Sequence, residues 1–467
     1  MRVGRLLVIV LALAWASLAG ATHAADVASI DGVTPEMEMR ESARSHAALV
    51  AQLGGEYPDR VLQAYIAGIG ARLIAAANSD AAAFQFTFTV LDTPGVLAFA
   101  QPGGFVYVSR AILALANSEA EVAAVLAHEM GHVILRHGSH RASLLAAFSD
   151  RPRREITIAA NALNHEQEIA ADAISVQILA AAGYDPAAQA QFLKTMDAQL
   201  TFEVDVGMRL HRNGETEAQP TVAERLALLD AALAGLPLSA RSARWYDGRA
   251  EHRAAIDNMV FGFRPAQGMV SRSRYVDAAT RITFDVPDGY QFRMGNGIAA
   301  DGPRGALLQI DARRMLAEME MGDYLRSVVA PDTHFNSVET GYIDGLRAAM
   351  ANAASGNEAK REYFILGAIR TANDRVMRFH FAQSEPFSEA EVAASRSSII
   401  SFRRISAAEA QAWQPVRIHM HAVSTATTLD AVAAQMDMPR GLDWLLRLND
   451  LPPGAILKAG DVVKVVR

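Results

Sequence analysis

The chain has 467 residues, more than one globular domain usually contains, so two or three domains are expected. Hydrophobic residues make up 51% and charged residues 20%, which excludes a chain that is disordered as a whole. The 44 Lys and Arg residues against 51 Asp and Glu give a net charge of −7, so no nucleic-acid partner is expected, and the lack of cysteine excludes disulfides and thiolate chemistry.

The first segment has the layout of a secretory signal peptide. Arg2 and Arg5 precede an apolar run from Leu6 to Leu18, and small residues follow up to Ala24. The run is too short to cross a bilayer comfortably and ends at a small-residue cleavage site, although a retained N-terminal anchor is the alternative. We expect residues 1–24 to be removed, which leaves an exported, periplasmic chain without a transmembrane span.

Changes of pattern along the remaining chain predict an α+β protein of three parts. Residues 35–235 are rich in Ala and Leu with helical periodicity, interrupted by strand-like residues 84–91 and 104–109. They predict helices packed on a small sheet. A linker is expected at 236–256, an α+β accessory domain at 257–410, and a small unit at 415–467. Expected strands in the last two parts are 282–286, 306–310, 361–369, 374–382 and 461–466, and expected helices are 322–329, 388–397, 429–436 and 442–448.

The clearest chemical motif lies on a predicted helix. Ser118-Glu119-Ala120-Glu121 is a capping box, so a helix should begin there and continue to about His137. It contains His128-Glu129-Met130-Gly131-His132. Residues four apart lie on one helix face, so both imidazoles can bind one ion, and Glu129 can reach the water in its open position. Two neutral nitrogens and a nearby base are suited to Zn²⁺, one ion per chain.

A second motif offers the remaining ligand. Glu168-Ile169-Ala170-Ala171-Asp172 lies in a later helical stretch. Glu168 would complete the His₂Glu set of a catalytic zinc site with one position left for water. Asp172, one turn further, can accept a hydrogen bond from the zinc histidine's other nitrogen. Glu166 is a rival third ligand, and Glu168 is preferred because of its four-residue spacing from Asp172.

Structural explanations compete with this interpretation. His128 and His132 could be satisfied core histidines, and Glu168 with Asp172 could form a solvated helix face. The mechanics of the motif, with three ligands and a base, favour catalysis. We expect His137 and His140 near the helix end or at the surface, where a cationic ring complements the helix dipole.

In order, spacing and flanks, these motifs resemble the gluzincin metallopeptidases of the HtpX, BepA and CaaX-prenyl-protease kind. The similarity covers roughly residues 41–235 and rests on residues 97–110, 118–121, 127–133 and 168–172. It implies a mainly helical zincin-type fold, zinc bound by His128, His132 and Glu168, Glu129 as general base, and endopeptidase activity. The chain is most similar to the periplasmic BepA-like branch, which is associated with quality control of outer-membrane proteins.

Two departures from that family concern substrate alignment and gating. Leu97 stands where family members usually carry Asn ahead of the Pro-Gly-Gly turn. Gln219 replaces a histidine that can gate the zinc in BepA-like members. His211 is a candidate substitute for that histidine, and the alternative is an exposed loop residue.

The C-terminal unit resembles a LysM module. The similarity lies in residues 423–429, 445–449 and 456–461, and it departs at Ala426-Thr427, where such modules usually have Gly-Asp. Glycan binding, and with it peptidoglycan as a partner, stays open beside a structural cap or a protein-docking domain.

The predicted chemistry is hydrolysis of a peptide bond. Zinc lowers the pKa of its water towards ~7, and Glu129 takes the proton and returns it to the leaving amine. Arg225, Tyr184 and His211 are candidates for stabilising the oxyanion. An extended substrate is expected to add as a strand beside residues 105–109, taken as the edge strand.

The leading hypothesis is therefore an exported zinc endopeptidase that acts on misfolded or misassembled cell-envelope proteins. One alternative is a chaperone or assembly adaptor with latent proteolysis. The other is a cell-wall amidase guided by the C-terminal unit.

Overall fold

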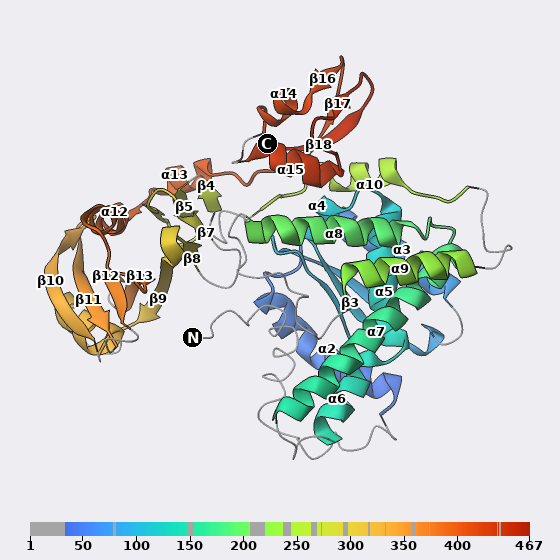
Figure 1. Cartoon of the computed structure of the whole chain (residues 1–467), viewed down its shortest axis with the longest axis horizontal. Helices are drawn as coiled ribbons and strands as arrows, with labels where there is room; N and C mark the ends of the chain where they lie inside the picture. The colour runs from blue at the N-terminus through green and yellow to red at the C-terminus, as the bar shows by residue number, and fades with distance from the viewer. Residues whose placement is uncertain are drawn as a thin grey trace. The chain divides into compact units, whose positions relative to one another are not determined.

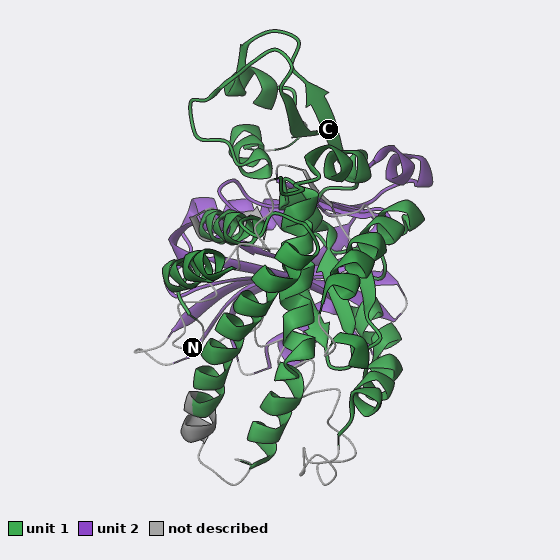
Figure 2. Ribbon diagram, turned by 90° about the vertical axis from the view of Figure 1, so that its right-hand side faces the viewer, with its two compact units in different colours: residues 1–202, 211–261, 416–467 green, residues 203–210, 262–415 purple. Residues whose placement is uncertain are grey.

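The computed structural model describes residues 33–77, 81–147, 153–205, 220–236, 244–262, 269–271, 273–292, 298–315, 318–331, 333–356, 361–372, 374–436, 438 and 440–467. The predicted signal peptide at 1–24 lies outside these residues. The chain divides into two compact units (Figure 2): unit 1 comprises residues 1–202, 211–261 and 416–467, and unit 2 comprises residues 203–210 and 262–415. Helices and strands occur in both units, in agreement with the α+β class.

Unit 1 is mainly helical around a small sheet (Figure 1). Its elements up to residue 261 are α2 (Pro35–Gln52), α3 (Arg60–Ala76), β1 (Thr87–Leu91), β2 (Ala98–Gln101), β3 (Phe105–Ser109), α4 (Arg110–Leu115), α5 (Glu119–Ile134), α6 (His137–Ala147), α7 (Arg153–Ala181), α8 (Ala188–Asp205), α9 (Val222–Gly235) and α10 (Arg249–Ile256). Its C-terminal part adds β15 (Ile418–Ala422), β16 (Thr427–Thr428), α14 (Leu429–Ala433), α15 (Gly441–Asn449), β17 (Ile456–Leu457) and β18 (Val462–Val466).

The predicted cap at Ser118 starts α5. The Ser118 hydroxyl accepts a hydrogen bond from the Glu121 backbone N–H, and the Glu121 carboxylate accepts one from the Asn117 N–H at 2.8 Å. These contacts satisfy backbone donors that a helix start otherwise leaves unpaired. The helix ends at Ile134, earlier than expected, because Arg136 adopts a left-handed conformation (φ 53°). His137 therefore begins α6 instead of ending α5.

The three-stranded sheet has the order β1-β3-β2, and this order corrects the predicted edge strand. β3 pairs with β1 in parallel and with β2 antiparallel, so residues 105–109 form the central strand. A central strand has its backbone donors and acceptors occupied on both sides, so it cannot accept an added strand. Among the described residues β2 pairs with β3 alone, and β2 is the edge strand on that side.

α5 and α7 pack closely against each other. A Cβ atom at Gly131 of α5 would lie 2.7 Å from the Ile174 side chain of α7, so only glycine permits this approach. Most of the α5 side chains between Ala120 and Met130 are buried in the main core of unit 1. The motif histidines of α5 therefore stand on a helix whose position is fixed by packing on several sides.

Part of the predicted linker at 236–256 is an integral element of unit 1. Residues 249–256 form α10, which begins after Gly248 in a left-handed conformation. His252 on this helix is fully buried, and its Nε2 atom lies 3.0 Å from the carbonyl oxygens of Leu113 and Ala116. Because these are the last carbonyls of α4, α10 contributes the cap that a helix end requires.

The C-terminal residues also belong to unit 1. β15 and β18 pair antiparallel, and their buried side chains join the same core cluster as α3, α4 and α5. The Lys464 ammonium donates hydrogen bonds to the carbonyl oxygens of Ala114 and Ala116, both at 2.8 Å. Lys464 is 1% exposed, and burial lowers the pKa of its amine to about 7, so buried hydrogen bonds hold the C-terminal part to the turn between α4 and α5.

Unit 2 is built on a seven-stranded antiparallel sheet of order β10-β11-β12-β13-β9-β8-β7 and a second sheet of order β14-β6-β5-β4. Apolar clusters cover both faces of the larger sheet, one involving α12 and the other α11. The elements are β4 (Met269–Ser271), β5 (Arg274–Asp277), β6 (Ile282–Asp285), β7 (Gln291–Phe292), β8 (Ile298–Asp301), β9 (Leu307–Arg314), α11 (Met321–Tyr324) followed by a π-turn (Leu325–Val329), β10 (His334–Ile343), β11 (Leu346–Ser355), β12 (Glu362–Ala372), β13 (Arg375–Gln383), α12 (Glu389–Ile400), β14 (Arg403–Arg404) and α13 (Ala407–Ala412).

Candidate metal centre

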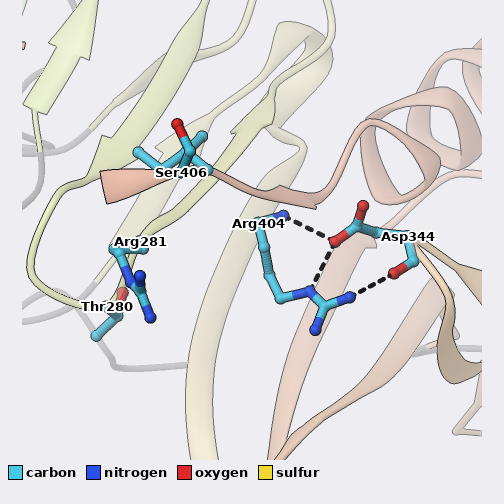
Figure 3. A pocket seen from close by; sticks show the side chains of 6 residues that line it. Thr280, Arg281, Asp344, Arg404 and Ser406 are labelled. Atoms are coloured by element: carbon cyan, nitrogen blue, oxygen red, sulfur yellow. Dashed lines mark hydrogen bonds and ion pairs between the residues drawn. The ribbon is translucent and has the colours of Figure 1, made fainter. Parts of the chain in front are cut away.

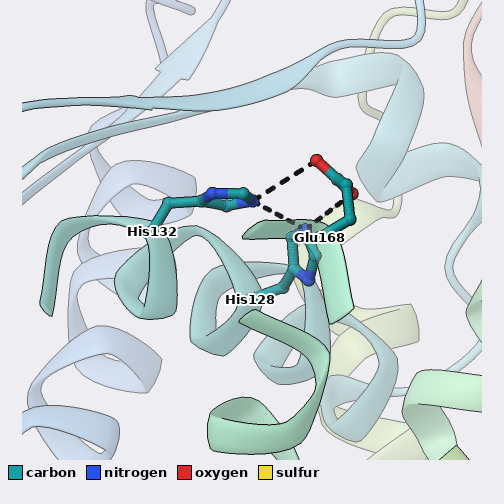
Figure 4. A group of neighbouring side chains, drawn as sticks. All are labelled: His128, His132 and Glu168. Atoms are coloured by element: carbon teal, nitrogen blue, oxygen red, sulfur yellow. Dashed lines mark hydrogen bonds and ion pairs between the residues drawn. The ribbon is translucent and has the colours of Figure 1, made fainter. Parts of the chain in front are cut away.

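Two helices bring the three predicted ligands together. His128 and His132 project from α5, Glu168 projects from α7, and their ligand atoms all lie within 4.8 Å of one another (Figure 4). The two Nε2 atoms are 3.1 Å apart, and each lies 3.6 Å from an oxygen of Glu168. Ligands about 2.0–2.1 Å from a tetrahedral zinc are separated by about 3.4 Å. The nitrogen and oxygen donors present therefore fit zinc in both chemistry and spacing.

The third-ligand rival is placed elsewhere. Glu166 is exposed on α7, whereas Glu168 is partly buried between the two histidines. Residues two apart on a helix point in directions that differ by about 200°, so both carboxylates cannot face one ion. Glu168, and not Glu166, therefore lies with the two histidines.

Asp172 lies beside the first histidine, as the sequence predicts. Its Oδ1 atom is 2.9 Å from His128 Nδ1, and its side chain is almost wholly buried. Arg225 of α9 donates to both Asp172 oxygens at 2.7 and 2.8 Å, and its Nη1 atom lies 3.2 Å from Glu168. Arg225 thus fixes two carboxylates at once, and Gln189 donates a further hydrogen bond to Asp172 at 2.8 Å.

The second histidine has a neighbour that the sequence analysis placed at a helix end or the surface. His137 is buried, and its Nδ1 atom lies 2.8 Å from His132 Nδ1. His137 turns inward because Arg136 adopts a left-handed conformation. Arginine is seldom found in that conformation, so the sequence alone does not indicate the turn. His140 is exposed on α6, as expected.

Burial and paired charges shift the pKa values of the cluster. Burial lowers the pKa of His128, but Asp172 and Glu168 outweigh it and raise the pKa to about 10. Burial, together with the neighbouring His128, lowers the pKa of His132 to about 3. Burial opposes ionisation of Glu168, yet the histidines and Arg225 lower its pKa to about 2. These shifts keep Glu168 negative and His132 neutral, and metal binding would displace the proton that Asp172 and Glu168 favour on His128.

The positive charges near Glu129 do not outweigh the effect of its burial. Burial raises its pKa to about 7, with Glu168 acting in the same direction and His128 and Arg225 opposing it. A carboxylate whose pKa lies near neutrality can both accept and return a proton, as a general base and acid must.

Of the oxyanion candidates, the structure separates Tyr184 from the metal centre. The Tyr184 hydroxyl donates to Glu119 at 2.7 Å, at the start of α5. This position is nine residues before His128, or about 14 Å along the helix. Tyr184 therefore cannot donate to an oxyanion at the metal. Arg225 is close to the centre, and His211 and Gln219 lie outside the described residues.

A separate cavity of about 370 Å³ occurs in unit 2 (Figure 3). Thr280, Arg281, Arg404 and Ser406 line it together with Asp344, whose carboxylate accepts hydrogen bonds from the Arg404 N–H and Nε–H at 2.9 Å. It contains none of the residues predicted to carry chemistry. Within the described part of the chain, no helix is both long and apolar enough to cross a membrane.

Two histidines four residues apart on one helix, with a glutamate between them and a carboxylate from a second helix, are the arrangement found in zincin metallopeptidases. In agreement, residues 61–151 match the model of Peptidase family M48. Over these residues the chain is similar to this family.

Curated relatives are similar over part of their length. The beta-barrel assembly-enhancing protease of Escherichia coli (strain K12) is 30% identical over 175 residues, which cover 32% of this chain and 36% of that protein. A putative beta-barrel assembly-enhancing protease of Vibrio cholerae is 42% identical over 79 residues, which cover 17% of this chain and 16% of that protein. The mitochondrial metalloendopeptidase OMA1 of Schizosaccharomyces pombe is 29% identical over 169 residues, 31% of this chain and 48% of that one. The chain thus spans about a third of the length of the first of these relatives.

Proposed function

We propose that unit 1 is a zinc-dependent endopeptidase, with one zinc ion bound by His128, His132 and Glu168. The observation that carries the proposal is the convergence of these three ligand atoms within 4.8 Å. The acidic side chains around them add support, because Asp172 lies 2.9 Å from the non-ligating Nδ1 atom of His128, and the partly buried Glu129 follows His128 on α5. Three protein ligands leave a position for water, which distinguishes a catalytic zinc site from a structural one.

When bound, zinc supplies a Lewis acid and makes water nucleophilic near neutral pH. Glu129 is proposed to accept the proton of the attacking water and to transfer it to the leaving amine, for which a pKa of about 7 is suited. Asp172 holds the His128 ring in one tautomer and orientation. Arg225, already paired with Glu168 and Asp172, acts in this proposal by holding those carboxylates in place.

The substrate is proposed to bind as an extended strand along β2. The hydrogen bond from the Ser109 N–H to the Leu97 carbonyl fixes the alternation of the β2–β3 ladder. Phe99 and Gln101 then direct their backbone groups toward β3, and Ala98 and Ala100 direct theirs outward. Main-chain hydrogen bonds to an extended peptide do not depend on its side chains. This mode suits unfolded proteins as substrates.

We further propose that the substrates are misfolded or misassembled proteins of the cell envelope, reached after export to the periplasm. The similarity to beta-barrel assembly-enhancing proteases supports this substrate class. The signal-peptide pattern at residues 1–24 supports export. Peptidoglycan binding by residues 415–467 stays a prediction from the LysM resemblance, and a peptidoglycan pull-down with the whole protein tests it.

The decisive experiment replaces Glu129 by Gln. The variant is expected to keep one zinc per chain and to lose cleavage of unfolded casein by about 10²–10⁴-fold, since it cannot carry the proton. Glu166→Gln, at an exposed position of α7, is the matched control and should cleave normally. Absence of zinc from the purified wild type, or cleavage by Glu129→Gln at the wild-type rate, would contradict the proposal.

The same variant separates a protease from an assembly adaptor. If Glu129→Gln restores envelope assembly as well as the wild type does, the cells need the protein as an adaptor and do not need its proteolysis. If uncleaved envelope proteins accumulate bound to the variant, the cells need the proteolysis.

A further inference from the structure

Each of the two histidines of the centre has a different side chain close to its Nδ1 atom, the ring nitrogen that does not face the other ligands. His128 Nδ1 lies 2.9 Å from Asp172, and His132 Nδ1 lies 2.8 Å from His137 Nδ1. The rings of His132 and His137 meet edge to face, with centroids 4.9 Å apart and planes at 74°. Two ring nitrogens at 2.8 Å require that one of them donates a proton and the other accepts it.

Metal binding decides which nitrogen donates. A histidine that binds zinc through Nε2 is neutral and carries its proton on Nδ1. His132 Nδ1 must therefore donate, and His137 Nδ1 must accept. In this arrangement His137 fixes both the tautomer and the ring orientation of His132.

The turn between α5 and α6 brings His137 to this position, and α2 holds the turn. Arg136, at φ 53°, donates to the Glu38 carboxylate from Nε at 2.9 Å and from Nη2 at 2.6 Å. Its Nη2 atom also donates to the Val33 carbonyl at 2.6 Å. The Ser139 hydroxyl donates to Glu38 as well, and the Glu38 side chain is buried. A left-handed conformation is unfavourable for arginine, and these contacts compensate for it.

Two further contacts hold the start of α6. The Gln167 side chain, adjacent to Glu168 on α7, donates to the His137 carbonyl at 3.2 Å. A Cβ atom at Gly138 would lie 2.8 Å from the Pro102 ring, so the turn lies directly against the β2–β3 connection. His137 is thus held by groups from α2, α7 and the β2–β3 turn.

We propose that His137 is a positioning residue of the metal centre. Its Nδ1 atom accepts a hydrogen bond from the Nδ1–H group of His132, and the Glu38–Arg136 ion pair holds His137 in this position. The inference rests on the proposed zinc site but concerns how strongly that site binds its ion. Loss of a hydrogen-bond partner behind a ligating histidine typically weakens metal binding by 10–100-fold.

The test is metal binding by the full-length protein, measured by chelator competition with Zn²⁺ and by the d–d absorption of Co²⁺. His137→Phe fills the volume but offers no acceptor, and it is expected to weaken zinc binding by about 10–100-fold and to change the Co²⁺ spectrum. His137→Asn places an oxygen one bond from Cγ, where the histidine has Nδ1, and is expected to restore both. His140→Ala, at an exposed position of the same helix, is the matched control and should leave both unchanged.

The outcomes separate this inference from the function. Equal zinc affinity in His137→Phe and the wild type would overturn the role of His137, as would equally weak binding by the Asn and Phe variants. A wild type that binds no zinc would overturn the proposed function itself. Melting of the metal-free proteins by circular dichroism checks folding. If His137→Phe does not fold, His137→Ala replaces it with the same expected loss.

Discussion

Replacing Lys464 by Met is expected to loosen the turn between α4 and α5, because Lys464 supplies a buried charge to that turn. Its ammonium donates to the Ala114 and Ala116 carbonyls, and methionine has a similar volume but no donor. The Ala116 carbonyl keeps His252 as a partner, whereas the Ala114 carbonyl loses the Lys464 donor.

The expected magnitude follows from these contacts. A buried carbonyl left without a donor costs about 1–3 kcal/mol. The buried Glu121 carboxylate also loses the electrostatic interaction with Lys464. Burial lowers the pKa of Lys464 to about 7, so the amine is charged below that pH. There, removing one partner from a buried pair of charges costs about 3–5 kcal/mol, and we expect a loss in this range. The double variant Glu121→Gln/Lys464→Met should recover part of it, since no lone charge is then buried.

Hydrogen–deuterium exchange of peptides that cover α4 and β18 measures this loss locally. A change of 3–5 kcal/mol corresponds to exchange faster by roughly two to three and a half orders of magnitude. Lys458→Met, at an exposed position of the same C-terminal part, is the control. If exchange in Lys464→Met equals that in Lys458→Met, the buried ammonium does not hold the turn and the reasoning is refuted.

Three further changes test other parts of the structure. Gly131→Ala should cost about 1–3 kcal/mol in unfolding free energy and weaken zinc binding, because its Cβ would press on α7; unchanged thermal melts and zinc titrations would contradict this. Ala100→Pro should raise KM for an unfolded protein with little change in stability, because it removes an outward N–H of β2, whereas an unchanged KM would exclude strand addition there. Burial, with Lys464 acting in the same direction, lowers the pKa of His252 to about 3, so only the unfolded chain binds its proton between pH 6.5 and 3. As pH drops through this window, the unfolding free energy of the wild type should therefore fall relative to that of His252→Gln, by up to about 1.4 kcal/mol per pH unit. Urea unfolding at a series of pH values measures this difference, and parallel profiles for the two proteins would contradict the pKa shift.

The members of the candidate metal centre could be located from the sequence because their signals are local. The cap at Ser118 and the spacing of His128 and His132 depend only on helix geometry, and the structure places both as expected. The order of the strands could not be predicted in the same way. β3 is central because β1, from earlier in the chain, pairs with it in parallel on the side opposite its hairpin partner β2, and strand propensity carries no information about this order.

Two other features escaped prediction for physical reasons. β11 (Leu346–Ser355) is rich in alanine, which favours helices, yet it forms a long strand. Small side chains are required there, since Ala349, Ala351 and Ala353 lie in the cluster with α11 and the π-turn that follows it. His137 escaped because the turn before it uses arginine, where the usual signal for a left-handed residue is glycine.

The position of Lys464 in the chain has a consequence for the order of events during biosynthesis. A nascent polypeptide that has emerged only as far as residue 415 has made all of α5 but not the strand that secures the turn before it. The whole of residues 262–415 must be translated before β18 can be added. We therefore expect α5 to reach its final rigidity only after β18 has been made, and the proposed hydrolytic activity to be delayed until then.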